Sequence, residues 1–108
     1  MILCLKPGVK LDGLAPQMAL GVFIVASVFW QFRATCTVTS ANDGKHGPNS
    51  LHSRNGLCRA CDFRTKDFAG DKLALVTAIR DALGRDFDVV LEDIGGENEH
   101  LHAEYDPK

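Results

Sequence analysis

The chain has 108 residues, of which 45% are hydrophobic and 24% are charged, and its formal net charge is −2. This composition fits a single domain spanning residues 1–108 and excludes collagen, a coiled coil and wholesale disorder. The charge is uneven, because residues 33–66 hold six basic and two acidic residues, whereas residues 67–108 hold four basic and eleven acidic residues. A phosphate-binding face needs clustered, unopposed cations, so nucleic acid is not an expected partner.

The first predicted element is a helix from Pro16 to about Phe32, since proline suits the first turn of a helix. Residues 13–32 carry no charge, and about 20 apolar residues can cross a bilayer. Small or polar residues nevertheless recur along one stripe of this helix, namely Gln17, Gly21, Ser27 and Gln31. We therefore expect a core helix with one face toward water or a sheet. A small membrane protein anchored through Gly13 to Phe32 is the alternative.

The rest of the sequence predicts four strands, one long loop and a second helix. The predicted elements are a strand from Arg33 to Thr39, a polar loop from Ser40 to Gly56, a strand from Leu57 to Arg64, a helix from Lys72 to Leu83, a strand from Phe87 to Leu91 and a strand from His100 to Tyr105. Asp71 and Gly84 are the expected cap and stop of the second helix. Its expected apolar face consists of Leu73, Val76, Ile79, Ala82 and Leu83. This order predicts an α+β fold with a small antiparallel or mixed sheet and two main helices.

The four cysteines are irregularly spaced, and the core does not require crosslinks, so we expect mostly reduced thiols. Cys58 and Cys61 form a C-x-x-C pair. Because the chain has no second such pair, the interpretation as buried structural thiols is favoured over a zinc or redox role.

The four histidines are confined to residues 46–52 and 100–102. His100 and His102 would point to the same face of a strand, where they could either be exposed or share one site. Asp62 lies within an apolar strand and needs a cation there, either zinc or an arginine such as Arg59 or Arg64. Two imidazoles and one carboxylate leave a fourth position on zinc for water, as in catalytic zinc sites.

The residues around these histidines resemble the S-x-H…G-x-A-x-D…E-x-x-H signature of the M15 peptidases. The matching stretches are Ser50-Leu-His52, Gly56, Ala60-Cys-Asp62 and Glu99-His-Leu-His102. That family includes zinc D-Ala-D-Ala carboxypeptidases and dipeptidases and phage L-alanyl-D-glutamate endopeptidases, and it shares the hedgehog-type fold. Phage and prophage members are the most similar, because they also carry a Thr-Ser and an Asp-Gly-Lys-His stretch, here Thr39-Ser40 and Asp43 to His46.

The resemblance implies a zinc ion bound by His52, Asp62 and His102, with Glu99 as the general base. The interval from His52 to Asp62 is longer than in the family pattern, and His46 is the reserve ligand. The reaction expected from the family is hydrolysis of an amide bond in peptidoglycan stem peptides by a zinc-activated water. Other residues expected near the substrate or the metal are Ser40, Lys45, His46, Ser50, Arg64 and His100.

The resemblance also predicts where the enzyme acts. We expect synthesis in the bacterial cytoplasm and action at the cell wall after holin-type release or delivery on a virion. A cleaved signal peptide is not expected, because a long segment containing Pro7 and Asp12 precedes the apolar stretch. A noncatalytic zinc-binding domain of the same fold is the second hypothesis, because metal binding does not need Glu99 and hydrolysis does.

Overall fold

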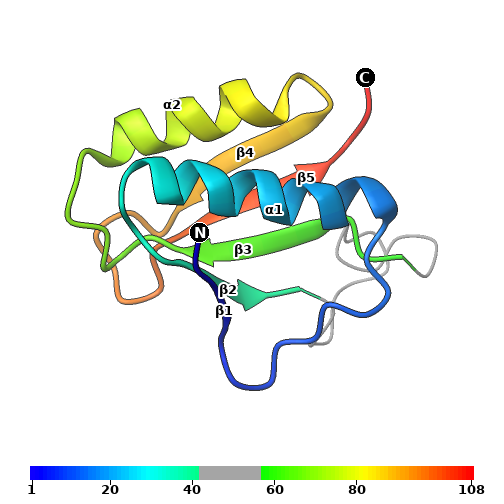
Figure 1. Ribbon diagram of the computed structural model, residues 1–108, viewed down its shortest axis with the longest axis horizontal. Coiled ribbons are helices and arrows are strands. Elements are labelled where there is room, and N and C mark those ends of the chain that lie inside the picture. Colours follow the sequence, from blue (N-terminus) through cyan, green and yellow to red (C-terminus); the bar gives the residue numbers. More distant parts are fainter. Residues whose placement is uncertain (42–56) are drawn as a thin grey trace.

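The computed structural model describes residues 1–41 and 57–108, which form a five-stranded mixed sheet with two helices packed across one face (Figure 1). The strands are β1 (Leu3–Leu5), β2 (Cys36–Ser40), β3 (Ala60–Arg64), β4 (Phe87–Glu92) and β5 (His100–Tyr105). Their order across the sheet is β1-β2-β3-β5-β4; β1 runs parallel to β2, and the other neighbours are antiparallel. The predicted α+β class, with a mixed sheet and two helices, is confirmed.

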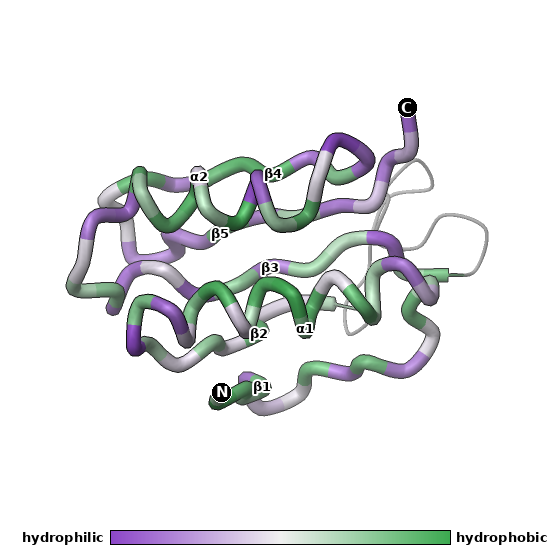
Figure 2. The backbone as a smooth tube through the Cα atoms, turned by 45° about the horizontal axis from the view of Figure 1, so that its top comes forward, coloured by the Kyte–Doolittle hydropathy of each residue, from purple (hydrophilic) through white to green (hydrophobic). Residues whose placement is uncertain are grey.

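Helix α1 (Pro16–Gln31) begins at the predicted proline and exposes much of one face. Gln17, Ser27 and Gln31 are exposed, as the polar stripe predicted, but Leu20, Phe23 and Trp30 are exposed beside them. Gly21 departs from that stripe, because it is buried where an added Cβ would lie 3.0 Å from the Phe87 ring. The most hydrophobic stretch of the backbone lies in the middle of α1 (Figure 2). Within residues 1–41 and 57–108, no helix is long and apolar enough to cross a membrane.

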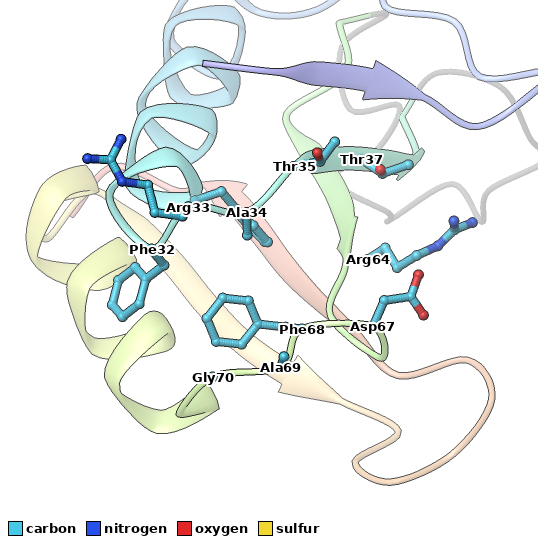
Figure 3. A pocket seen from close by; sticks show the side chains of 11 residues that line it. Phe32, Arg33, Ala34, Thr35, Thr37, Arg64, Asp67, Phe68, Ala69 and Gly70 are labelled. Carbon is cyan, nitrogen blue, oxygen red and sulfur yellow. The ribbon is translucent and has the colours of Figure 1, made fainter.

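Because of the way α1 ends, the next strand, β2, begins later in the sequence than predicted. Arg33 adopts a left-handed φ of 59°, and the Ala34 N–H donates to the Phe29 carbonyl at 3.0 Å, which closes the helix with a Schellman-type turn. Phe32 then packs edge-on against Phe68, with ring centroids 5.7 Å apart (Figure 3). The prediction of a strand from Arg33 was therefore wrong by three residues, because residues 33–35 form the helix stop and its exit.

Helix α2 (Lys72–Leu83) has the predicted ends. The Asp71 carboxylate accepts hydrogen bonds from the N–H groups of Leu73 and Ala74, at 3.0 and 3.2 Å. Gly84 follows the helix with a φ of 85°. The buried face consists of Leu75, Val76, Ile79 and Leu83. Leu73 and Ala82 were wrongly assigned to it, because at 100° per residue they fall on either side of the arc that faces α1 and the sheet.

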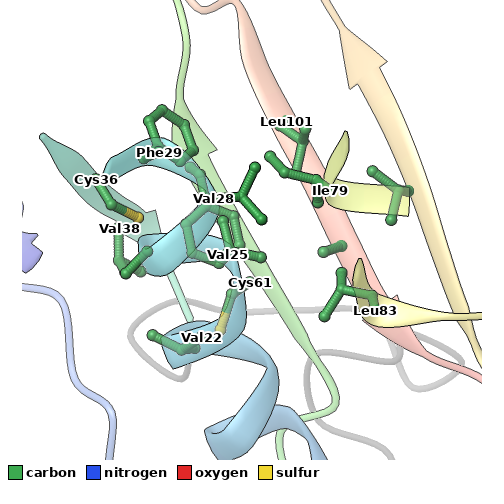
Figure 4. Close-up of a cluster of buried hydrophobic side chains, with 14 of the residues drawn as sticks. Val22, Val25, Val28, Phe29, Cys36, Val38, Cys61, Ile79, Leu83 and Leu101 are labelled. Atoms are coloured by element: carbon green, nitrogen blue, oxygen red, sulfur yellow. The ribbon is translucent and has the colours of Figure 1, made fainter. Parts of the chain in front are cut away.

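The core lies between the helices and the sheet and is built from alternate residues of each strand. Valines and Phe29 of α1 contact Ile79 and Leu83 of α2 and the inward residues of the sheet, among them Val38, Cys61 and Leu101 (Figure 4). Cys58 and Cys61 are buried, and no disulfide joins the four cysteines. Because β5 turns Leu101 and Ala103 inward, His100, His102 and Glu104 occupy the opposite face of the sheet, which neither helix covers.

Candidate metal centre on the open face of the sheet

The pairing of β3 with β5 brings together residues that are far apart in the sequence. Asp62 lies opposite His102, and Arg64 lies opposite His100. On the outer side of β5, the β4 register places Glu92 opposite His100. We define the open-face cluster as the two histidines of β5 and the three carboxylates that contact them, namely Asp62, Glu92, His100, His102 and Glu104.

Asp62 and His102 form the closest contact in this cluster. His102 Nδ1 lies 2.8 Å from Asp62 Oδ1, and its Nε2 lies 2.9 Å from Glu104 Oε1. The hydrogen bond to Asp62 is the main reason that the pKa of His102 is raised from 6.5 to about 9, although burial of the ring lowers it. The ring is therefore protonated at neutral pH and must lose a proton before either nitrogen can bind a metal.

His100 and Glu92 lie beside this pair. His100 Nε2 lies 3.1 Å from Glu92 Oε1 and 3.8 Å from Asp62 Oδ2, while its Nδ1 lies 2.6 Å from the Asn98 carbonyl. Asp62 thus contacts two histidines, and in the described part of the chain it forms no ion pair with Arg59 or Arg64. The proposed arginine partner of Asp62 is replaced by imidazole.

A metal ion could be held by Asp62, Glu92 and His102, whose ligand atoms all lie within 4.8 Å of one another. Carboxylate oxygen and imidazole nitrogen are common zinc ligands, so this donor set fits zinc chemically. A second acidic group, Asp88, Glu104 and Asp106, contains no imidazole. Lys108 already lies 2.9 Å from Asp88 and 3.5 Å from Asp106. Sequence reasoning missed Glu92, since only the β4–β5 register shows that it lies beside the histidines.

The structure places several of the other predicted residues. Ser40 lies opposite Asp62 on β2, at the edge of the open-face cluster. Arg64 lies two pairs further along β3, opposite His100, and these two residues line a neighbouring cavity. His52 falls outside the described residues, as do Lys45, His46 and Ser50.

Glu99, the predicted general base, is buried and faces other partners. Its Oε2 accepts hydrogen bonds from Lys72 Nζ and Thr65 Oγ1, both at 2.7 Å, and its Oε1 accepts one from the Gly95 N–H at 3.1 Å. The Lys72 hydrogen bond is the largest cause of a lowered pKa at Glu99, against the opposing effect of burial. The structure therefore brings Asp62 and His102 together but does not bring the Glu99 carboxylate to them.

Neither a family model, nor a curated protein, nor a solved structure matches this chain.

Proposed function

We propose that the chain is a zinc-dependent peptidase acting on peptidoglycan stem peptides, with Asp62, His102 and His52 as the zinc ligands. The observation that supports this proposal is the 2.8 Å contact between Asp62 and His102 on neighbouring strands. These are two of the three ligand positions that the sequence motif implies. When bound, zinc would polarise the substrate carbonyl and lower the pKa of a water molecule toward neutrality.

The protein's own residues would prepare this site. Asp62 supplies a carboxylate oxygen, and His102 supplies a ring nitrogen once its proton is lost. With Nδ1 directed toward Asp62, Glu104 accepts a hydrogen bond from Nε2–H and orients the imidazole, a role that carboxylates commonly have beside metal-binding histidines. Glu99 would have to release Lys72 before its Oε2 could accept a proton from water.

A noncatalytic zinc-binding domain of the same fold is the second candidate, and the position of Glu99 favours it. Three donors already occupy the Glu99 carboxylate, and a general base needs a free lone pair directed at the water. In this alternative, Glu99 joins the turn before β5 to α2, while Asp62 and His102 still bind zinc.

Zinc content measured on reconstituted protein tests the ligand assignment. We expect about one zinc per chain in the wild type, as one such site requires, and strongly reduced zinc in Asp62→Ala and His102→Ala. Asp88→Ala is the matched control, because it removes a carboxylate from the second acidic group on the same face. A wild type that binds no zinc contradicts both candidates. Zinc retained in Asp62→Ala and lost in Asp88→Ala places the metal elsewhere.

Digestion of purified peptidoglycan then separates the two candidates. If the chain is a peptidase, zinc-loaded wild type releases stem-peptide fragments, and Glu99→Gln keeps its zinc but loses roughly a hundredfold in rate. Glu97→Gln is the control, because it removes an exposed carboxylate from the same turn. A zinc-loaded wild type that releases no fragments supports the noncatalytic domain.

A further inference from the structure

A small cavity lies beside the open-face cluster, where the ends of β1, β2 and β3 meet the turn before β5. Its volume is about 160 Å³. Its cationic and neutral polar lining consists of Lys6, Thr39, Arg64, Lys66 and Asn98, and Glu97, Glu99 and His100 complete it. Lys6 follows β1, whereas Arg64 and Lys66 lie together at the end of β3, so the fold brings cations from two distant segments to one cavity.

The three cations of this lining are Lys6, Arg64 and Lys66. In residues 1–41 and 57–108, the side chains of Lys6, Arg64 and Lys66 form no hydrogen bond or ion pair, although Arg64 is only partly exposed. Figure 3 shows Arg64 and Asp67 projecting on the same side of β3, yet these two residues form no ion pair. The Arg64 guanidinium can therefore donate to an anionic acceptor from outside the chain, in a charge-assisted hydrogen bond.

The two carboxylates in the lining do not cancel this positive charge. Glu99 is already bound to Lys72, at 2.7 Å, and is 3% exposed. Glu97 is exposed, and its single negative charge offsets the charge of only one of the three cations. The cavity therefore keeps a net positive charge in a chain whose formal net charge is −2.

We propose that this cavity binds an oxyanion, either a carboxylate or a phosphate group. A guanidinium presents paired N–H donors that match either group bidentately, and lysines add point charges. Thr39 and Asn98 supply neutral donors at the rim. The volume equals that of about five water molecules at roughly 30 Å³ each, which suits one oxyanion and a few attached atoms. This inference does not depend on zinc or on peptidase activity.

The site can be tested on metal-free, chelator-treated full-length protein by NMR titration of backbone amides. The probes are inorganic phosphate, glycylglycine with a free carboxylate, and glycylglycinamide, which lacks one. We expect saturable shifts centred on Thr39, Arg64 and Asn98 with phosphate or glycylglycine and none with glycylglycinamide. The tighter of the two binders identifies the anion. No saturable shift with either anion, or equal shifts with glycylglycinamide, would overturn the proposal.

Two variants and one control separate a built site from general charge attraction. Arg64→Gln should weaken anion binding at least about tenfold, the scale of one lost charge-assisted hydrogen-bond pair. Arg85→Gln removes the same charge from the exposed turn between α2 and β4 and should leave binding unchanged. Lys66→Gln is exposed and should fold even if Arg64→Gln does not, and it should weaken binding severalfold. Equal weakening in Lys66→Gln and Arg85→Gln would contradict the proposal.

Discussion

His102 lies between two carboxylates, and this position couples the stability of the metal-free protein to pH. Its folded pKa of about 9 exceeds the ordinary value of 6.5, so the protonated ring stabilises the fold. This contribution is complete below the unfolded pKa and is lost as the pH rises through the folded pKa. We expect the unfolding free energy, measured with urea and a chelator, to be about 3 kcal/mol higher near pH 6 than near pH 9.5.

The control for this pH dependence is His102→Gln, which keeps a polar side chain but cannot titrate. We expect the difference between the two pH values to shrink markedly in that variant. An equal difference in His102→Gln and wild type would show that other groups control it. His100→Gln is a second comparison, because His100 shares the face and contacts Glu92 and Asp62.

The Asp62–His102 pair and Glu99 show what a motif can and cannot predict. The structure brings Asp62 and His102 together, because the two residues lie opposite each other on paired strands and share a face. The motif could not place the Glu99 carboxylate, because its partners Lys72 and Thr65 belong to other elements. Whether the carboxylate of such a motif can act as a base therefore depends on tertiary contacts, and the spacing of residues in the motif does not predict these contacts.

At the scale of single elements, the N-terminus of α2 depends on Asp71. Its carboxylate satisfies two N–H groups that the helix itself leaves without acceptors. Asp71→Ala should lower the unfolding free energy by about 1 kcal/mol. The measurement is urea unfolding at neutral pH, with Asp81→Ala as control, because Asp81 is exposed on the same helix. A loss no larger than that of Asp81→Ala would mean that the cap contributes nothing.

Both helices and the strands β4 and β5 were predicted within one residue of their ends, whereas β1 was missed. Pro16, Asp71 and Gly84 mark helix ends through their own chemistry, and the structure has both helices there. Strand β1 was missed because three residues, Leu3–Leu5, give no usable alternation. Its position depends on parallel pairing with β2 across the whole of α1, which a local pattern does not contain.

At the scale of the whole molecule, both helices pack on one face of the sheet, and polar and charged side chains occupy the other face. The open face is divided, with the carboxylate and histidine cluster next to a cavity lined by three cations. The division follows from strand register, because Asp62 and Arg64 are two residues apart on β3 and so share a face. A ligand with a negative group could therefore contact the cavity while another part of it lies at the Asp62–His102 pair.

Zinc binding at this face should stabilise the whole fold, because Asp62 and His102 lie on different strands and meet only when the sheet forms. A ligand at about 100 times its Kd adds about 2.7 kcal/mol to the unfolding free energy. For a domain of this size that corresponds to a rise in Tm of roughly 10–20 °C. Thermal unfolding with and without zinc should show this rise in wild type and Asp88→Ala but not in Asp62→Ala. A similar rise in Asp62→Ala would place the stabilising zinc at other residues, since that variant lacks one of the two described ligands.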